Sequence, residues 1–443
     1  MSGPVRGRGE TQRRAVHLAM GGLAFLLPWL SPLEAAGAAG GAVLFNLFVL
    51  PRLAPSLFRE GERGSPWRSG IVIYPIAVLL LVLVFHRRMD IVAAAWGIMA
   101  AGDSAAGWIG RRLGRRPIPW NRAKTVEGSI AFALAAWLFS WAVLVFMGRP
   151  AMGAAVLAAA ASLFAAFMES LPWRLDDNLT VPLLSAAFLA GLLEVDPERL
   201  QAAAPTLGPL FLLAVGINTV LAFGFRRSGM VDSSGMIAGL FVGVLTMVFA
   251  GWRGFLILVA FFVLGSGATR LGRRRKERLG IAQEKKGARS ARHALANCGV
   301  AVYLAFLVLS AAEPAMFALA FVCAYATAAF DTVSSEIGRA YGGRPVLITT
   351  LRPVPAGTDG GVSWAGTLAG LAAAWVLCAI ATATGFIPTE RTPLVLAAAF
   401  IGSTADSILG ATLETRGLID NEAVNFSNTL VGALSGIGLL ALS

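Results

Sequence analysis

Acidic and basic side chains stand together where one apolar run ends and the next begins, within residues 102–129. Asp103 lies near the end of the first run, and an unpaired carboxylate in hydrocarbon requires a cation or a role. The loop that follows carries the basic residues Arg111, Arg115, Arg116 and Lys124. Guanidinium groups bind phosphate oxygens in bidentate fashion. The pattern therefore favours a site for a metal-bound polyphosphate at a membrane edge.

Two further short motifs suit the same chemistry. Asp176, Asp177 and Asn178 open a later apolar run, and carboxylate oxygens are the ligands that Mg²⁺ prefers. Glu127, Gly128 and Ser129 begin another run, where the free amides of a helix start could hold a phosphate. A lone basic loop or a lone acid at a helix end also has a simpler interpretation, as a topology determinant or a helix cap.

A second copy of the Asp103 motif lowers the weight of that simpler interpretation. DTVSSEIGRAYGGRP from Asp331 aligns without a gap on DSAAGWIGRRLGRRP from Asp103. The two stretches share the Asp, an Ile-Gly-Arg triplet, a later Gly and the closing Arg-Pro. We therefore predict two related halves, residues 1–200 and 201–443.

The composition predicts the elements that position these residues. Of 443 residues 56% are hydrophobic and 14% charged, against roughly 25% charged in soluble domains. This indicates an all-α polytopic membrane protein with about fifteen spans. The predicted spans are 15–31, 35–50, 70–85, 90–108, 130–147, 152–168, 179–193, 208–225, 234–250, 254–269, 294–311, 314–331, 364–385, 393–411 and 424–442.

The basic residues predict the orientation. With a cytoplasmic amino terminus, all but six of the 37 Lys and Arg residues fall on the cytoplasmic side, as the positive-inside rule expects. This accounts for the net charge of +12 without nucleic acid. Seven spans in each half would invert the second half, so we interpret 208–225 as a linking helix that makes the two seven-helix repeats parallel. Asp420-Asn421 then corresponds to Asp177-Asn178.

The first half resembles the phytol kinase and dolichol kinase family of CTP-dependent polyprenol kinases. The resemblance rests on Arg13-Arg14-Ala15-Val16-His17, Gly61-Glu62-Arg63-Gly64, GDSAAGWIGRRLG, AKTVEGS and DDNLTVP, over about residues 10–195. It implies phosphoryl transfer from CTP or another nucleotide to a long isoprenoid alcohol. Because Arg14 and His17 belong to the motif, we expect the first apolar run to be a retained helix and not a cleaved signal peptide.

The second half is similar to a related family, the phytyl-phosphate kinases, over about residues 205–443. The matching motifs are TRLG, RHALAN, DTVSSEIG, RPVPAGTDGGVSWAGT and DSILGA, together with the polar run through Asp420 and Asn425. This implies phosphorylation of an isoprenyl monophosphate to the diphosphate. His293 departs from the Gln that the motif leads one to expect.

Together, residues and resemblance predict a bifunctional enzyme of the cell membrane with both sites facing the cytoplasm. For the first site we expect Asp103 and Asp177 to hold Mg²⁺ and Asp176 to activate the hydroxyl, with Arg14, His17 and the basic loop on the phosphates. For the second site we expect Asp331, Asp359 and Asp406 to hold the metal. Its expected phosphate-binding residues are Asn297, Glu336, Arg339, Arg344, Arg352, Thr358, Ser363, Asn421 and Asn425.

Two other functions fit some of the same features. A cytidylyltransferase that forms a CDP-lipid would use similar acids and a similar basic loop, and would release pyrophosphate instead of CDP. A transporter also suits parallel repeats, although the acidic residues gather at one membrane face and not at the midplane. The isolated residues Cys298, Cys323 and Cys378 support neither a disulfide framework nor a zinc site.

Overall fold

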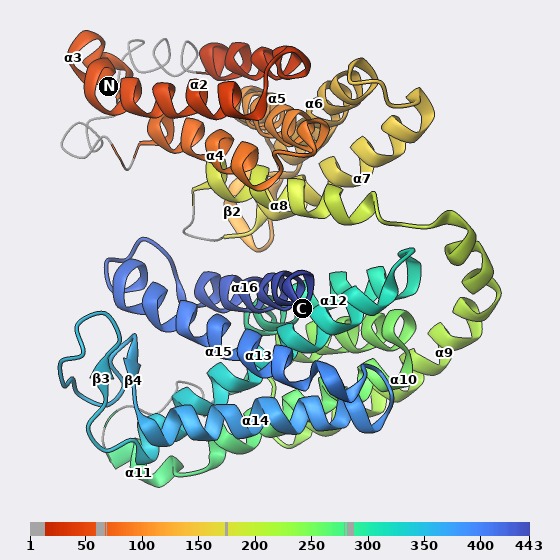
Figure 1. Ribbon diagram of the computed structural model, residues 1–443, viewed down its shortest axis with the longest axis vertical. Helices are drawn as coiled ribbons and strands as arrows, with labels where there is room; N and C mark the ends of the chain where they lie inside the picture. The colour runs from red at the N-terminus through yellow and green to blue at the C-terminus, as the bar shows by residue number, and fades with distance from the viewer. Residues whose placement is uncertain (1–13, 59–66, 68, 173–175, 279, 281–287) are drawn as a thin grey trace. The chain divides into compact units, whose positions relative to one another are not determined.

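The computed structural model describes residues 14–58, 67, 69–172, 176–278, 280 and 288–443, and their regular structure is almost entirely helical (Figure 1). In this part of the chain, ten helices are long and apolar enough to cross a membrane, and Gly70–Val84 and Asp177–Leu192 are shorter apolar helices. The structure thus confirms the all-α polytopic class, but the count does not reach the predicted number of about fifteen spans.

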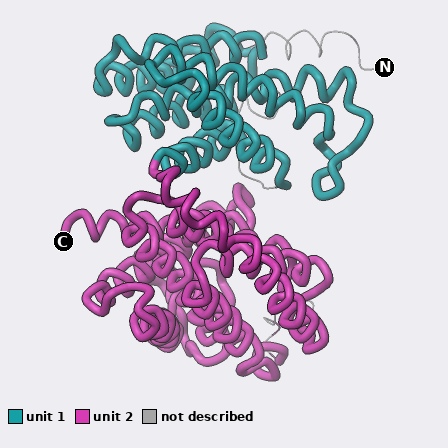
Figure 2. Tube along the Cα trace, turned by 90° about the vertical axis from the view of Figure 1, so that its right-hand side faces the viewer, with its two compact units in different colours: residues 1–193 teal, residues 194–443 magenta. Residues whose placement is uncertain are grey.

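The chain divides into two compact units, Met1–Leu193 and Glu194–Ser443 (Figure 2). In unit 1, residues 14–21 are also helical. Its further elements are η1 (Gly22–Trp29), α2 (Pro32–Leu44), η2 (Phe45–Val49), α3 (Leu50–Leu53), η3 (Pro55–Leu57), α4 (Gly70–Val84), α5 (Met89–Leu113), β1 (Pro117–Ile118), β2 (Asn121–Thr125), α6 (Val126–Phe146), α7 (Ala151–Ser170) and α8 (Asp177–Leu192).

Unit 2 begins with a long helix and repeats the order of a buried helix, a short hairpin and an apolar helix. Its elements are α9 (Pro197–Arg227), α10 (Ser233–Arg270), α11 (Arg273–Arg278), α12 (Ala291–Ser310), α13 (Pro314–Tyr341), β3 (Val346–Leu347), β4 (Gly361–Val362), α14 (Trp364–Ala383), η6 (Thr389–Arg391), α15 (Thr392–Leu409), η7 (Gly410–Glu414) and α16 (Asn421–Leu442). The β1–β2 and β3–β4 pairs are both antiparallel.

Each unit is organised around one buried helix. Residues 91–102 of α5 and 317–331 of α13 are buried without interruption, as a helix that is apolar all round requires. Both stretches are rich in Ala, which lets neighbouring helices approach closely. Asp103 and Asp331 therefore stand where the buried part of each central helix ends.

The central helices pack on their partners, α6 and α14, in opposite ways. Gly102 of α5 faces Phe132 of α6, and a Cβ at Gly102 would lie 2.6 Å from the ring. In unit 2 the large residue is on the central helix, since a Cβ at Gly370 of α14 would lie 2.6 Å from Phe330 of α13. Each pair fills its own contact, because packed interiors leave no room for an added methyl group.

The α10 helix is interrupted and reverses direction. Gly251 has φ 66° and ψ −173°, which is not helical and suits glycine. A straight helix of 38 residues would extend about 57 Å. Both ends of α10 nevertheless contact Arg289, through Gly235 and Gly265. The arms on either side of Gly251 thus correspond to the separately predicted spans 234–250 and 254–269.

Candidate active sites

A cavity of about 830 Å³ lies in unit 2, between α12, α13, α15, α16 and the segment that leads into α14. Most of the residues predicted for the second site line it, namely Asn297, Asp331, Glu336, Arg339, Thr358, Asp359, Ser363, Asp406, Asn421 and Asn425. Arg344 and Arg352 are exposed in the segment between α13 and α14 and are not part of the lining. Segments far apart in the sequence thus meet in one polar space.

Two carboxyl groups form the centre of this cavity. Asp331 of α13 and Asp406 of α15 are hydrogen-bonded to each other, and the amide nitrogen of Asn428 donates to Asp406 Oδ1 at 2.8 Å. Within the described residues, neither carboxylate forms an ion pair with Lys or Arg. Glu414 and Asp359 lie close enough to add negative charge. Such a group requires a proton or an external cation.

The buried cation of unit 2 is committed elsewhere. Lys276 of α11 and Glu336 of α13 form an ion pair in which neither side chain is more than 3% exposed. Lys276 Nζ also donates to Thr269 O at 2.8 Å. Arg339 lies 3.8 Å from the same Glu336 carboxylate and lines the cavity. Glu336 therefore binds two cations at the cavity wall. Because its carboxylate is negatively charged, it would act on a phosphate through these cations and not by direct contact.

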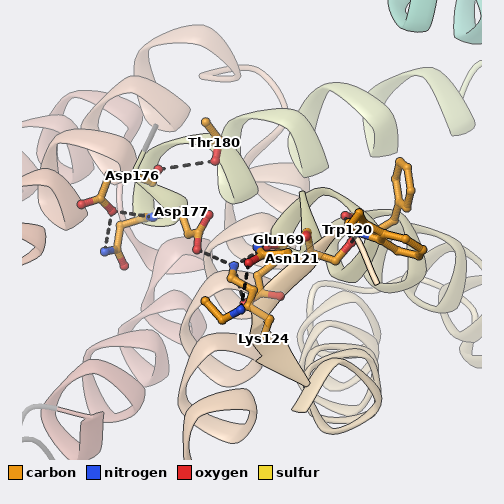
Figure 3. Close-up of polar contacts among 11 residues, drawn as sticks. Trp120, Asn121, Lys124, Glu169, Asp176, Asp177 and Thr180 are labelled. Carbon is orange, nitrogen blue, oxygen red and sulfur yellow. Dashed lines mark hydrogen bonds and ion pairs between the residues drawn. The ribbon is translucent and has the colours of Figure 1, made fainter. Parts of the chain in front are cut away.

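Unit 1 contains an acidic cluster that carries its own cation (Figure 3). Lys124 of β2 lies 2.8 Å from Glu169 at the end of α7 and 2.8 Å from Asp177 at the start of α8. Burial lowers the pKa of the Lys124 ammonium, but the two carboxylates outweigh this and hold the pKa above its ordinary value. Lys124 is therefore charged across the physiological pH range and offsets part of the negative charge of the cluster.

Asp103 and Asp176 differ in their surroundings. The charge of Asp103 on α5 acts on both Glu169 and Asp177, which places it beside the cluster. Among the described residues it has no ion-pair partner. Asp176 instead caps α8, because its Oδ1 accepts hydrogen bonds from the Asn178 backbone N at 2.9 Å and side-chain N at 2.8 Å. In Figure 3 it stands apart from Lys124.

The basic loop of unit 1 keeps its guanidinium groups exposed. Arg111, Arg115 and Arg116 are all solvent-accessible. Glu127 Oε2 accepts the backbone amides of Arg115 and Arg116 at 3.1 and 3.3 Å, and so fixes the loop. The amide of Gly128 bonds to Thr125 Oγ1 at 3.2 Å, as Gly366 does with Ser363 in unit 2. These amides are thus already bonded to the capping hydroxyl groups of Thr125 and Ser363, while the exposed guanidinium groups of the loop remain accessible to an anion.

The amino-terminal helix adds two predicted residues to the same unit. The Arg14 carbonyl accepts a hydrogen bond from Ser104 Oγ, next to Asp103, at 3.3 Å. The His17 ring packs edge-on against Tyr74 at 4.4 Å. Arg14 therefore lies beside α5, and His17 beside α4. Gly61-Glu62-Arg63-Gly64 and Arg13, which belong to the predicted motif, lie outside the described residues.

Three functional candidates escaped the sequence analysis. Glu169 is an acid at the end of an apolar helix, and the cost of a charge in such a place could have singled it out. Lys276 stands in a basic run that has the composition of a topology signal, and Arg289 follows a similar stretch. Nothing in the residue pattern marks these two, because their partners are distant in sequence.

Similar proteins exist in several organisms. An uncharacterized membrane protein of Synechocystis sp. is 39% identical over 45% of this chain and 79% of that protein. Protein VTE6 of Arabidopsis thaliana, a chloroplastic protein, is 34% identical over 57% of this chain and 78% of that protein. A family profile described as integral membrane protein DUF92 matches residues 216–433. The chain belongs to the DUF92 family.

The DUF92 match lies within unit 2 and contains the lining residues from Asn297 to Asn425. The chain is also similar to a probable phytol kinase of Oryza sativa subsp. japonica, with 33% identity over 42% of this chain and 66% of that protein. No solved structure matches this DUF92 protein. The chain is thus an integral membrane protein with similarity to a membrane-associated kinase family.

Proposed function

We propose that the chain is a bifunctional membrane kinase. Unit 1 would phosphorylate a long-chain isoprenoid alcohol such as phytol or geranylgeraniol to the monophosphate, and unit 2 would convert the monophosphate to the diphosphate. CTP is the proposed donor for both steps. The similarity to a probable phytol kinase supports the substrate class, and the resemblance of the two halves to two kinase families supports the order of the steps.

One observation carries this proposal. Asp103 and Asp331 end the buried parts of α5 and α13, and each stands in an acidic cluster beside arginines that can bind phosphate. Phosphoryl transfer needs mainly positioning and neutralisation of charge on the phosphates. Both clusters offer these groups at corresponding points of the two units.

In unit 1 the reaction would begin at the hydroxyl of the alcohol. Its oxygen forms a bond to the γ-phosphorus, the bond from that phosphorus to the β–γ bridging oxygen breaks, and the nucleoside diphosphate leaves. The hydroxyl proton passes to Asp103, the carboxylate without an ion-pair partner in the described cluster. We favour Asp103 over the predicted Asp176, whose oxygen caps α8. Lys124 and the exposed arginines of the loop would face the phosphates.

In unit 2 an oxygen of the monophosphate would form a bond to the γ-phosphorus, the bond from that phosphorus to the β–γ bridging oxygen would break, and the nucleoside diphosphate would leave. No hydroxyl proton has to be removed in this step. Arg339 is placed to hold phosphate oxygens in the cavity, and Thr358, Ser363 and Asn421 add polar groups to its wall. A cavity of about 830 Å³ has the size of small-molecule sites in proteins. The space would hold the nucleotide phosphates together with the lipid head group.

Mg²⁺ fits unit 2 better than unit 1. Asp331 and Asp406 form a carboxyl pair without a basic partner, and Mg²⁺ in such sites uses one or two carboxylates together with substrate phosphates. No group of three or more ligands is preassembled in the described residues. When bound, Mg²⁺ would neutralise phosphate charge there. In unit 1, Lys124 already occupies Asp177, so the predicted pair Asp103 and Asp177 suits a metal less well.

We further propose that the units are parallel repeats in an arrangement of about fifteen spans in the cell membrane, with both sites cytoplasmic. Residues predicted for the opposite side come together within each unit, which supports this orientation. In unit 1, Arg149 binds Asp90 at 2.7 Å. In unit 2, Arg253 donates to Gly385 O at 3.3 Å.

The pair of variants Asp103→Asn and Asp331→Asn tests the assignment. Purified protein is given CTP, Mg²⁺ and geranylgeraniol, and the lipids and nucleotides are analysed by mass spectrometry. We expect Asp103→Asn to abolish formation of the monophosphate and Asp331→Asn to let it accumulate. Arg274→Gln, at an exposed arginine of α11 outside the cavity lining, is the control. Normal diphosphate formation by both Asp variants would refute the proposal, and release of pyrophosphate instead of CDP would indicate a cytidylyltransferase.

A further inference from the structure

A second, smaller cavity of about 90 Å³ adjoins the polar cavity of unit 2. It lies between α9, α10 and α12 and is lined mainly by apolar side chains, among them Phe225, Leu258 and Phe262. We call it the apolar slot. The slot and the polar cavity share Arg289, Ser290, His293 and Asn297. An apolar space therefore opens onto the acidic cavity across one polar boundary.

The boundary contains the partly buried guanidinium of Arg289, which has no acidic partner within the described residues. Two hydrogen bonds fix the backbone of Arg289. Its N–H donates to Met230 O at 3.0 Å, and its carbonyl accepts from the Asp232 N–H at 3.1 Å. Its guanidinium carbon lies 5.3 and 5.5 Å from the ring centres of Phe261 and Phe262. Within the described residues it has no ion pair. A partly buried guanidinium without a carboxylate partner is suited to an anionic ligand.

Asn297 provides an independent sign of a polar ligand at the same boundary. The side chain is 8% exposed, and its nitrogen donates to His293 O at 2.9 Å. Its Oδ1 is buried without a hydrogen-bond partner in the described part of the chain. Buried polar atoms are rarely left unpaired, so this acceptor oxygen marks a place where a hydrogen-bond donor, such as a water molecule or a protonated phosphate oxygen, is expected.

We propose that the apolar slot holds the hydrocarbon chain of a single-chain lipid monophosphate and that Arg289 binds its phosphate. The head group would then project into the polar cavity beside Asp331 and Asp406. This inference deepens the proposed function of unit 2, on which it rests, by naming the substrate subsite and the residue that selects a phosphorylated lipid.

The slot also reaches the exposed surface of α10. Gly239 of α10 lines the slot and is exposed, and a Cβ added there would meet nothing within 4 Å. Exposed apolar side chains, including Phe223 and Phe241, lie on the same two helices. A volume of about 90 Å³ accommodates only the part of the chain next to the head group. The remainder would lie along these helices in the membrane.

Filling the slot tests where the chain binds. We expect Gly239→Phe in the full protein, reconstituted in phosphatidylcholine vesicles, to raise the KM for geranylgeranyl monophosphate about tenfold or more, because apolar contact is lost. The KM for dimethylallyl monophosphate, whose chain is short, should change little. Gly267→Phe is the matched control, since Gly267 is an exposed α10 glycine with the same open space but outside the slot. Gly239→Leu replaces the Phe variant if that variant does not insert.

Arg289 is tested by charge. Arg289→Gln should weaken equilibrium binding of geranylgeranyl monophosphate, measured without nucleotide, about tenfold or more, and Arg289→Lys should restore part of it. Geranylgeraniol binding should be unaffected by either change. Arg273→Gln, at an exposed arginine of α11, is the control.

The outcomes separate the two proposals. If wild-type protein binds the monophosphate, and Arg289→Gln weakens this binding as expected, but the protein never phosphorylates the monophosphate, the proposed function fails and the subsite stands. If it phosphorylates the monophosphate and the Gly239 and Arg289 variants behave as their controls, the subsite fails and the function stands. Absence of both binding and phosphorylation overturns both.

Discussion

Each unit has an acidic cluster where the buried part of its central helix ends, but the two clusters differ in the cations beside them. In unit 1, Lys124 lies between Glu169 and Asp177. Lys124 directly precedes the helix-capping Thr125, and in unit 2 the residue directly before the capping Ser363 is Val362, which lines the cavity. The residue directly before the helix-capping residue is therefore a lysine, Lys124, in unit 1 and an apolar residue, Val362, in unit 2.

The difference indicates how much positive charge each site has to receive from a bound ligand or metal ion. The single ammonium of Lys124 offsets part of the charge of the unit 1 cluster before any ligand arrives, and under the proposed function Asp103, which has no ion-pair partner among the described residues, would act on a neutral hydroxyl. The Asp331 and Asp406 pair has to receive a proton or a metal, and it becomes most favourable when a cation and phosphates arrive together. The contrast agrees with an alcohol as the first substrate and a nucleotide with a lipid monophosphate in the second site.

Removal of the buried lysine of unit 2 is the largest perturbation we expect. Lys276→Met leaves the buried Glu336 with the more distant Arg339, at 3.8 Å, as its cationic partner among the described residues, which should lower the free energy of unfolding by up to about 3–5 kcal/mol. Thermal unfolding in detergent measures it. Arg273→Ala is the control, because its pair with Glu277 is exposed and worth about 0.3–0.5 kcal/mol. Equal effects of the two changes would show that Lys276 does not neutralise Glu336.

Removal of the lysine of unit 1 should have a smaller effect on stability and a selective effect on activity. In Lys124→Met we expect a loss of about 2 kcal/mol, since this ion-pair cluster is partly solvent-exposed. Formation of the monophosphate should fall while conversion of added monophosphate continues. Arg122→Met, an exposed neighbour on β2, is the matched control. If conversion of monophosphate to diphosphate falls equally, the clusters do not act separately.

Placing a lysine before the capping residue of unit 2, as in unit 1, tests directly whether this side chain accounts for the difference between the two clusters. Val362→Lys places an ammonium at the cavity wall near Asp331 and Asp406. By competing for the carboxylates it should raise the Mg²⁺ concentration needed for the second step about tenfold, equivalent to about 1.4 kcal/mol. Mg²⁺ titrations with geranylgeranyl monophosphate measure this, with Val362→Met as the neutral control. An unchanged Mg²⁺ requirement would argue against a metal on this pair.

The positions of the helices could be predicted from the sequence with local rules. Every predicted apolar range coincides with helical residues, and the interruption near Gly251 separates two of them. The count of membrane-crossing helices could not be predicted in the same way. Helices such as α5 are buried by neighbouring helices and carry charges at their ends, so hydrophobicity alone does not define how they cross.

The candidate sites were predictable only in part. Asp331 and Asp406 line one cavity as expected, because each stands at the end of an apolar run on the same side. The ion pair of Lys276 with Glu336 and the place of Arg289 depend on contacts between distant segments, which single-sequence patterns do not contain. Asp176, which the sequence suggested as the group that activates the hydroxyl, caps α8, as an acid before a helix usually does.

The exchanged glycine and phenylalanine have a consequence for how the chain assembles. If α5 docked wrongly on α14, Gly102 would meet Gly370 and leave a hole, a defect that costs on the order of 3–5 kcal/mol for a missing Phe. If α13 docked on α6, Phe330 and Phe132 would compete for one volume. Mismatched partners are thus penalised in both combinations, so that during insertion each half recognises its own helices even though both follow a common plan.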